Sequence, residues 1–247
     1  SRLLFVGYIL HVCAALCRET PTNLKGKKHS SQLWLDRQIR DPYVEKAKQE
    51  NYRCRSAFKL LEMNERFKFL KPGQIVIDCG AAPGSWSQVA VKMTNADGKR
   101  EEAVGTVLAV DKQPLYHIPG ATVLGKMDFT SAKSQAELLK FLNGEKADVV
   151  LSDMAPSATG VRDLDHDNII ILAYAAVKFA LQVMKVDGTF VCKLWDGGKS
   201  QRVEQDLARF FKSVRCVRPQ ATRDESTEKF ILARGFKGVK SIAAGTT

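Results

Sequence analysis

The chain has 247 residues, and its hydrophobic content of 45% and charged content of 26% are ordinary for one globular α/β domain with appendages. Its formal net charge of +11 favours a polyanionic partner, because Lys and Arg side chains gain free energy by displacing counterions from phosphates. The 6 cysteines include no C-x-x-C pair and no spaced Cys/His set, which excludes a zinc-binding module and indicates a reducing compartment.

Residues 1–33 differ from the rest and are predicted to be a basic leader followed by a linker. The apolar stretch from Leu3 to Cys17 is too short for a transmembrane helix, so no membrane partner is expected. Its length suits a secretory signal, whereas an acid-poor segment with Arg is typical of an organelle transit peptide. The cysteine pattern favours the second interpretation. We therefore expect a protein of the mitochondrial matrix, with an export signal and a membrane anchor as alternatives.

Residues 34–71 are predicted to be helical and basic. Asp41 and Pro42 mark the start of one helix, because Pro suits the first helical position. A second helix follows, with Ser56 as its predicted N-cap. Most of its cations fit a solvated helix face, but Lys59 lies within an apolar run. The basic residues assigned to this second helix are Arg53, Arg55, Lys59, Arg66 and Lys68.

The first strand and the loop after it form the stretch around which the chain is organised. The β-branched residues 75–77 predict a buried strand, and the small residues from Asp78 to Trp86 predict a strand-to-helix turn. In open α/β sheets, ligands bind at such turns beyond the carboxyl ends of the strands. The loop matches neither the dinucleotide fingerprint nor the P-loop. A structural turn without a ligand is the alternative.

Strands and helices alternate along the rest of the chain, which predicts a doubly wound, mostly parallel, seven-stranded α/β sheet with right-handed crossovers. The folded domain is expected to span residues 34–240, with residues 241–247 as a tail. The later strands are expected at residues 104–110, 122–124, 148–151, 189–194, 214–217 and 230–233, and the later helices at residues 131–142, 168–185 and 200–211.

Three consecutive strands are followed by acids. Asp111 ends the second strand, where a carboxylate commonly binds ribose hydroxyls in nucleotide-binding sheets. Asp128 follows the third strand and is a candidate for the adenine amino group, and Asp153 follows the fourth. One such acid is ordinary in a turn, but three at the same sheet edge indicate a binding site.

Lys193 interrupts a strand that is otherwise suited to burial. A buried lysine is costly unless it is paired, so carboxylates are expected beside it. Asp153 ends a neighbouring strand, and Glu228 begins the last one. The alternative interpretation is a structural salt bridge.

Five segments together resemble the FtsJ family of RNA 2′-O-ribose methyltransferases in order and spacing. The segments are Arg55 to Leu60, Asp78 to Trp86, Ser152 to Pro156, Val191 to Lys193, and Glu228. The resemblance covers residues 34–235 and implies a Rossmann-like class I methyltransferase that uses S-adenosylmethionine. Within the family, the sequence Met-Ala-Pro at residues 154–156 resembles the bacterial and mitochondrial large-subunit rRNA branch. Ser157 and a longer insert at residues 95–103 depart from the family pattern.

The resemblance implies a role for each matching residue. The tetrad Lys59, Asp153, Lys193 and Glu228 would surround the target ribose. The cofactor site would consist of Pro83, Gly84, Ser85, Trp86, Asp111, Asp128 and Asp153.

Methyl transfer to a ribose hydroxyl requires an in-line geometry and removal of a proton. We assign Lys193 as the base, with a pKa lowered by burial and by Lys59, and Asp153 and Glu228 as orienting groups. If Lys193 stays charged, it instead steers the hydroxyl and stabilises the developing alkoxide. No metal is expected, and residues 163–167 are interpreted as a loop and helix cap because they fail the EF-hand pattern.

The partner implied by the resemblance is large-subunit rRNA or a precursor of the large ribosomal subunit, with a uridine in the peptidyl-transferase region as the target and a role in subunit biogenesis. A tRNA or mRNA-cap methyltransferase is the alternative among enzymes. An RNA-binding assembly factor that does not need catalysis is the alternative from another class. The protein is expected to be a monomer. The candidate phosphate contacts are Arg53, Arg55, Lys199, Arg202, Arg218 and Arg223.

Overall fold

The computed structural model describes residues 38–156 and 159–239. The predicted leader and linker (1–33) and the predicted tail (241–247) lie outside these residues. In the described part of the chain, seven strands form one sheet in the order β3-β2-β1-β4-β5-β7-β6. The strands are β1 (Ile75–Cys79), β2 (Thr106–Val110), β3 (Ala121–Leu124), β4 (Ala147–Ser152), β5 (Met184–Trp195), β6 (Phe211–Val217) and β7 (Glu228–Phe236).

The sheet is parallel from β3 to β5, and β7 pairs antiparallel with both β5 and β6. The chain builds outward from β1 in one direction through β2 and β3, and then in the other direction through β4 and β5. The order therefore reverses between β1 and β4, and ligands of open α/β sheets bind in the crevice at such a reversal. This arrangement confirms the predicted fold class.

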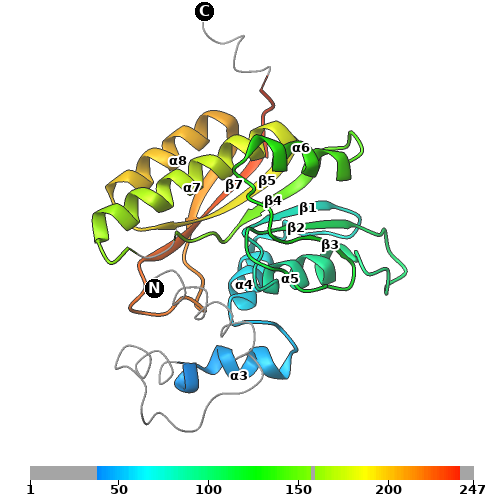
Figure 1. Cartoon of the computed structure of the whole chain (residues 1–247), viewed down its shortest axis with the longest axis horizontal. Helices are drawn as coiled ribbons and strands as arrows, with labels where there is room; N and C mark the ends of the chain where they lie inside the picture. The colour runs from blue at the N-terminus through cyan, green and yellow to red at the C-terminus, as the bar shows by residue number, and fades with distance from the viewer. Residues whose placement is uncertain (1–37, 157–158, 240–247) are drawn as a thin grey trace, which may run out of the picture.

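Helices cover both faces of the sheet (Figure 1). Residues of α6, α7 and α8 pack on one face, and residues of α3, α4 and α5 pack on the other. The helices are α3 (Pro42–Gln49), α4 (Ala57–Phe67), α5 (Ser85–Thr94), α6 (Ala132–Phe141), α7 (Arg162–Val183) and α8 (Gly198–Phe210). No helix among the described residues combines the length and the apolar character needed to cross a bilayer.

β1 shows why this sequence forms a central strand. All five of its residues are buried. Ile75 and Ile77 belong to the core beneath α7, and Val76 belongs to the core beneath α5. Successive side chains of a strand point to opposite faces, so a continuous β-branched run fills both cores at once. The β-branched run at residues 75–77 therefore becomes the strand that precedes the predicted cofactor loop.

The start of α7 differs from the prediction. Residues 163–167 are helical, because α7 begins at Arg162 and not near residue 168. The turn before the helix is fixed by Asp165, whose Oδ1 accepts hydrogen bonds from the amide and the hydroxyl of Thr159, each at 2.7 Å. Asp163 and Asp165 lie in the first turn, where a carboxylate is favoured by the helix dipole.

One further expectation is corrected. The second basic helix, α4, begins at Ala57, so Arg53 and Arg55 lie in the turn before it.

Among the cysteines of the described residues, Cys79 and Cys192 are buried, whereas Cys216 is exposed. The reason is its place on β6, which pairs with β7 alone and forms an edge of the sheet.

Candidate active site

The register of the sheet brings the predicted tetrad together at the carboxyl edge of the parallel strands. Ser152 pairs with Cys192, so Asp153, the residue after β4, comes beside Lys193 on β5. Lys193 is opposite Phe230 on β7, and Glu228 lies two residues from Phe230 on the same face. Side chains from three neighbouring strands therefore converge.

The four side chains form one chain of ion pairs. The Nζ of Lys193 lies 3.0 Å from Asp153 Oδ1 and 3.4 Å from Glu228 Oε2. The other oxygen of Glu228 pairs with Lys59, which α4 supplies from the opposite side. Each side chain is at most 17% exposed, so these charges interact in a medium much less polarisable than water. The two positive charges of the lysines equal the two negative charges of the carboxylates.

The charge of Lys193 differs from the expectation for a free amine base. Burial lowers its pKa, but the adjacent charges of Asp153 and Glu228 outweigh burial, and the pKa is raised above its ordinary value. Lys59, which was expected to lower the pKa of Lys193, is itself paired with Glu228. Burial also raises the pKa of Asp153, but the charges of Lys193 and Lys59 and a hydrogen bond from Ser56 lower it overall. Lys193 is therefore an ammonium group in the resting site.

Ser56 is a site residue that sequence reasoning misassigned. It occupies the N-cap position of α4, but its side chain does not cap the helix. Its hydroxyl instead donates to Asp153 Oδ2 at 2.6 Å. Its carbonyl oxygen accepts a hydrogen bond from Trp86 Nε1 at 2.9 Å. Ser56 thus joins the tetrad to the predicted cofactor loop. Its position three residues before Lys59, one helical turn away, was the available signal.

The predicted cofactor loop connects β1 to α5. Two consecutive amides, those of Gly80 and Ala81, donate to the carbonyl of Val110 at 2.9 and 3.1 Å. Gly80 has a φ of +76°, and a Cβ atom there would lie 2.2 Å from Met154 Cγ, so only glycine fits. The loop ends at Gly84, the N-cap position of α5, where the N-cap residue offers no side chain to the first-turn amides. Pro83, Gly84 and Ser85 are therefore at the positive end of a helix.

Asp111 follows β2 and Asp128 follows β3, and a backbone hydrogen bond links the two segments. Asp111 Oδ2 accepts the amide of Ala82 at 2.8 Å, which ties the loop to this strand. The carbonyl of Asp111 accepts the amide of Met127 at 2.9 Å and thereby places Asp128 beside it. A hydrogen bond from the Thr130 hydroxyl to Asp128 lowers the pKa of that carboxyl. Both carboxylates therefore lie at the edge where the sequence placed them.

The side chains of Trp86 and Asp78 are buried in the protein interior next to the loop. Trp86 is 2% exposed, and its ring lies 5.5 Å from that of Phe230, so its side chain belongs to the core. The predicted role of Trp86 in cofactor binding is therefore limited to its backbone amide. Asp78 accepts the Ser87 hydroxyl at 2.6 Å through Oδ2, while its buried Oδ1 has no hydrogen-bond partner among the described residues. Burial raises the pKa of Asp78 to about 7.

A polar cavity adjoins the tetrad. It has a volume of about 380 Å³, and Arg55, Arg223 and Ser226 line it together with Lys59 and Glu228. Both arginines are held by one carboxylate, that of Asp41: its Oδ2 lies 2.9 Å from Arg55 Nη1 and 3.1 Å from Arg223 Nε. Glu225 also lines the cavity, so three cations and two carboxylates face a space that is large enough for part of a nucleotide.

The other predicted phosphate contacts have different roles. Arg53 donates to the carbonyls of Pro83 and His117 at 2.8 and 2.6 Å, so its guanidinium holds the cofactor loop and is not presented to a phosphate as expected. Arg218 likewise binds backbone carbonyls. Lys199 forms an ion pair with Asp167 on the surface, and Arg202 is exposed. No cluster of three or more His, Cys, Asp or Glu side chains that could hold a metal exists in the described part of the chain.

The sheet thus carries a glycine loop at its reversal and a lysine-carboxylate cluster beside it. The family described as FtsJ-like methyltransferase matches residues 52–236, and the chain belongs to that family. The predicted resemblance is therefore confirmed.

Individual relatives narrow the comparison. The chain is 49% identical to rRNA methyltransferase 2, mitochondrial, of Drosophila melanogaster, over 96% of this chain and 98% of the relative. It is 47% identical to ribosomal RNA large subunit methyltransferase E of Cereibacter sphaeroides, over 87% of each chain. Among solved structures, a ribosomal RNA methyltransferase from Plasmodium falciparum superposes with a TM-score of 0.67 at 26% identity, covering 76% of this chain and all of that one.

Proposed function

We propose that this protein transfers a methyl group from S-adenosylmethionine to the 2′-oxygen of a ribose in large-subunit rRNA. The observation that carries the proposal is the ammonium group of Lys193, held between Asp153 and Glu228 at the mouth of the cofactor loop. A cation flanked by carboxylates can hold and orient a ribose hydroxyl. A site that methylates a base or a protein side chain does not need such a group.

The residues of the loop region fit S-adenosylmethionine. The unpaired Oδ1 of Asp78 is a buried acceptor at the base of the loop, in a position that favours a cationic ligand nearby. The first-turn amides of α5 suit a carboxylate, as helix N-termini commonly do. Asp111 and Asp128 suit ribose hydroxyls and an exocyclic amine. The loop region thus offers hydrogen-bonding groups for both the amino-acid part and the nucleoside part of S-adenosylmethionine.

The bound cofactor would supply a methyl group on a positively charged sulfur, which is already a strong electrophile. The task of the protein is then to position the 2′-hydroxyl in line and to accept its proton. Lys193 donates an N–H to the 2′-oxygen and orients its lone pair. When the methyl group is transferred to the 2′-oxygen, Lys193 would give one of its protons to Asp153, 3.0 Å away, and take the hydroxyl proton in its place. Lys193 ends the step charged, as it began.

Lys59 and Glu228 complete the ribose site in this proposal. Glu228 contacts both lysines, so it fixes the direction of the Lys193 side chain. The two arginines in the cavity beyond Lys59 and Glu228, Arg55 and Arg223, suit a phosphate that flanks the target ribose. The target nucleotide would enter from the side of Arg55 and Arg223.

The substrate class rests on the relatives and on charge. The two sequence relatives named above are rRNA methyltransferases, and the net charge of +11 favours a nucleic acid. The mitochondrial relative matches nearly the whole chain, which supports the matrix as the location. We extend the proposal to a uridine in the peptidyl-transferase region, to a role in large-subunit biogenesis and to a monomeric enzyme.

Incubation with S-adenosylmethionine labelled in the methyl group tests the substrate class. Separate pools of mitochondrial rRNA, tRNA and capped mRNA, each free of prior methylation, would be compared under the same conditions. Label in the large-subunit rRNA alone is expected. Label in tRNA or in the cap alone would replace the rRNA substrate with one of these alternatives.

A further inference from the structure

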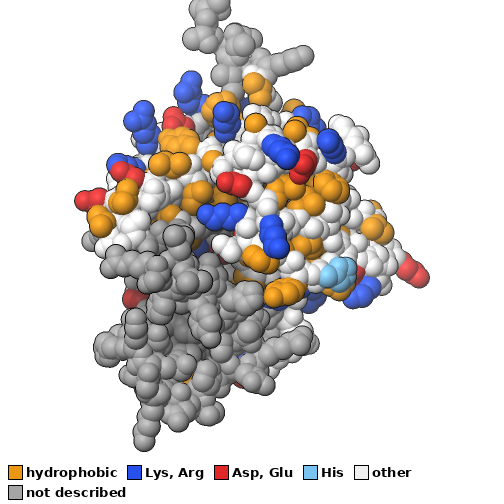
Figure 2. Space-filling model, viewed as in Figure 1, with side chains coloured by type: hydrophobic (Ala, Val, Ile, Leu, Met, Phe, Trp, Pro, Cys, Tyr) orange, Lys and Arg blue, Asp and Glu red, His pale blue; other side chains and the backbone are white. Residues whose placement is uncertain are grey.

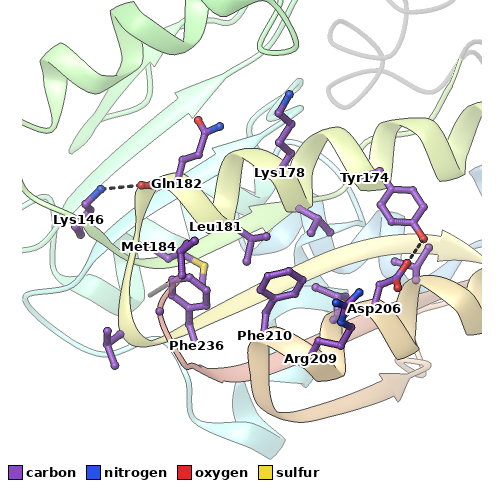
Figure 3. A pocket seen from close by; sticks show the side chains of 16 residues that line it. Lys146, Tyr174, Lys178, Leu181, Gln182, Met184, Asp206, Arg209, Phe210 and Phe236 are labelled. Atoms are coloured by element: carbon purple, nitrogen blue, oxygen red, sulfur yellow. Dashed lines mark hydrogen bonds between the residues drawn. The ribbon is translucent and has the colours of Figure 1, made fainter. Parts of the chain in front are cut away.

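An apolar groove lies between α7 and α8, away from the tetrad. Its volume is about 920 Å³. Leu181, Met184, Phe210 and Phe236 gather around it (Figure 3). Val186, at 64% exposure, forms part of its border. An opening of this size is in the range of ligand-binding pockets, and neither the tetrad nor the cofactor loop uses it.

The groove and the active site lie at opposite edges of the sheet. β7 begins at Glu228 in the tetrad and ends at Phe236 in the groove. Eight steps of about 3.3 Å place these two residues roughly 26 Å apart. A molecule bound in the groove therefore leaves the proposed RNA site open.

The border of the groove is positively charged. Lys178 and Arg209 are exposed there, and neither forms an ion pair within the described residues. Lys146 donates to the carbonyl of Gln182 at 2.7 Å. The acid at the groove, Asp206, accepts the hydroxyl of Tyr174 at 2.7 Å. Hydrophobic patches bordered by Lys and Arg side chains are visible on the part of the molecule that carries α7 and α8 (Figure 2).

We propose that this groove binds an amphipathic helix of a partner protein, with apolar side chains in the groove and Asp or Glu side chains facing Lys178 and Arg209. α7 and α8 form two walls of the groove, and Met184 and Phe236 from the ends of β5 and β7 add to its apolar lining. An apolar groove between helices suits the apolar face of another helix. The unpaired cations select an acidic flank.

Other occupants match this surface less well. The phosphates of RNA could bind the cations at the border, but RNA has no aliphatic groups to pack against Leu181, Met184, Phe210 and Phe236. A second copy of this chain would bring the same cations, and like charges would face each other across a two-fold interface. An acidic amphipathic helix matches both the apolar lining and the cationic border of the groove.

Selection from a random 16-residue peptide library tests the proposal with the full-length protein. The library would be depleted on the Val186→Glu variant and then enriched on the unmodified protein. We expect peptides with apolar residues at helical spacing and acidic flanks. A fluorescent peptide from this set should lose at least ~10-fold in affinity to Val186→Glu and to the double variant Lys178→Glu/Arg209→Glu.

The matched control is Ile171→Glu, which also places a charge on a β-branched residue of high exposure, 65%, but outside the groove. This variant should bind the peptide normally, and circular dichroism and thermal melting should confirm that all variants are folded. Enrichment of basic peptides, equal binding to Val186→Glu, or no enrichment would overturn the proposal. Two further results would replace it: binding of anionic phosphatidylglycerol vesicles in place of peptides, or a dimer in solution that Val186→Glu dissociates.

Discussion

Replacement of Lys193 by alanine separates a catalytic role from a structural one. The change removes the ammonium group 3.0 Å from Asp153 and 3.4 Å from Glu228. Glu228 keeps its ion pair with Lys59, and Asp153 keeps the hydrogen bond from Ser56. One carboxylate therefore loses its direct cationic partner, whereas the other does not.

The cost in stability follows from this asymmetry. Breaking a buried ion pair costs about 3–5 kcal/mol, and the remaining partners of both carboxylates place Lys193→Ala near the lower value. For a chain of this size, about 3 kcal/mol lowers the melting temperature by about 6–12 °C. The stranded Asp153 should have a raised pKa in the folded variant. Its contribution to stability is then largest at low pH and is lost as the pH rises, so the defect should shrink on acidification.

The cost in catalysis is measured separately from the cost in stability. Loss of the group that holds and relays the hydroxyl proton is expected to slow transfer by about 100- to 10,000-fold. Cofactor affinity should change little, because the loop from Pro83 to Ser85 and Asp111 are untouched. Single-turnover transfer, calorimetric cofactor binding and thermal melting would be measured on the same preparation.

Lys229 provides a matched control for this substitution. Its side chain is 15% exposed, against 13% for Lys193, and it also pairs with two carboxylates, those of Asp196 and Glu204, at 3.0 and 3.2 Å. Lys229→Ala should lower the melting temperature without slowing transfer. A Lys193→Ala protein that is destabilised but transfers methyl groups at a near-normal rate per folded molecule would refute the proposed role of Lys193.

Three further predictions follow from the structure and the sequence. Ser56→Ala removes the charge-assisted hydrogen bond to Asp153, which is worth about 1.5–3 kcal/mol. It should slow single-turnover transfer by about tenfold or more without changing cofactor affinity, and Ser56→Thr should restore the rate. An unchanged rate in Ser56→Ala would show that Ser56 does not act in the site. The pKa of Asp78 is raised to about 7 by burial, so its contribution to stability is complete below about pH 4 and is lost as the pH rises through 7. In urea unfolding from pH 4 to 8, the free energy of unfolding of Asp78→Asn should vary less with pH than that of the unmodified protein and should be larger at pH 8. Parallel pH dependences of the two proteins would contradict this. A reporter fused behind residues 1–40 should enter mitochondria, whereas export or a cytosolic signal would contradict the predicted leader.

The fold could be predicted because its signals are local. The β-branched run at residues 75–77 fills two cores at once, and the alternation of strands and helices defines a doubly wound sheet. The edge of the sheet was predictable for the same reason. Asp111 and Asp153 follow parallel strands directly, and the carboxyl ends of parallel strands meet at one edge.

The remaining features depend on contacts between distant segments. The hydroxyl of Ser56 could cap α4 or bind Asp153, 97 residues away, and the sequence does not decide between them. The charge of Lys193 depends on how closely two carboxylates approach, which local sequence does not encode. The resemblance assigns Trp86 to the cofactor site, and local sequence does not indicate that the first turn of α5 directs its side chain into the core. Such roles emerge only from the packing of α4 against α5 and the sheet.

The position of the transferred methyl group tests the central proposal most directly. A methyl group on a ribose 2′-oxygen blocks attack of that oxygen on the adjacent phosphate, so the linkage survives alkali. With labelled S-adenosylmethionine and large-subunit rRNA, the unmodified protein should place its label in an alkali-resistant dinucleotide, and Lys193→Ala should place almost none there. Label released in mononucleotides, or attached to a base, would contradict 2′-oxygen methylation.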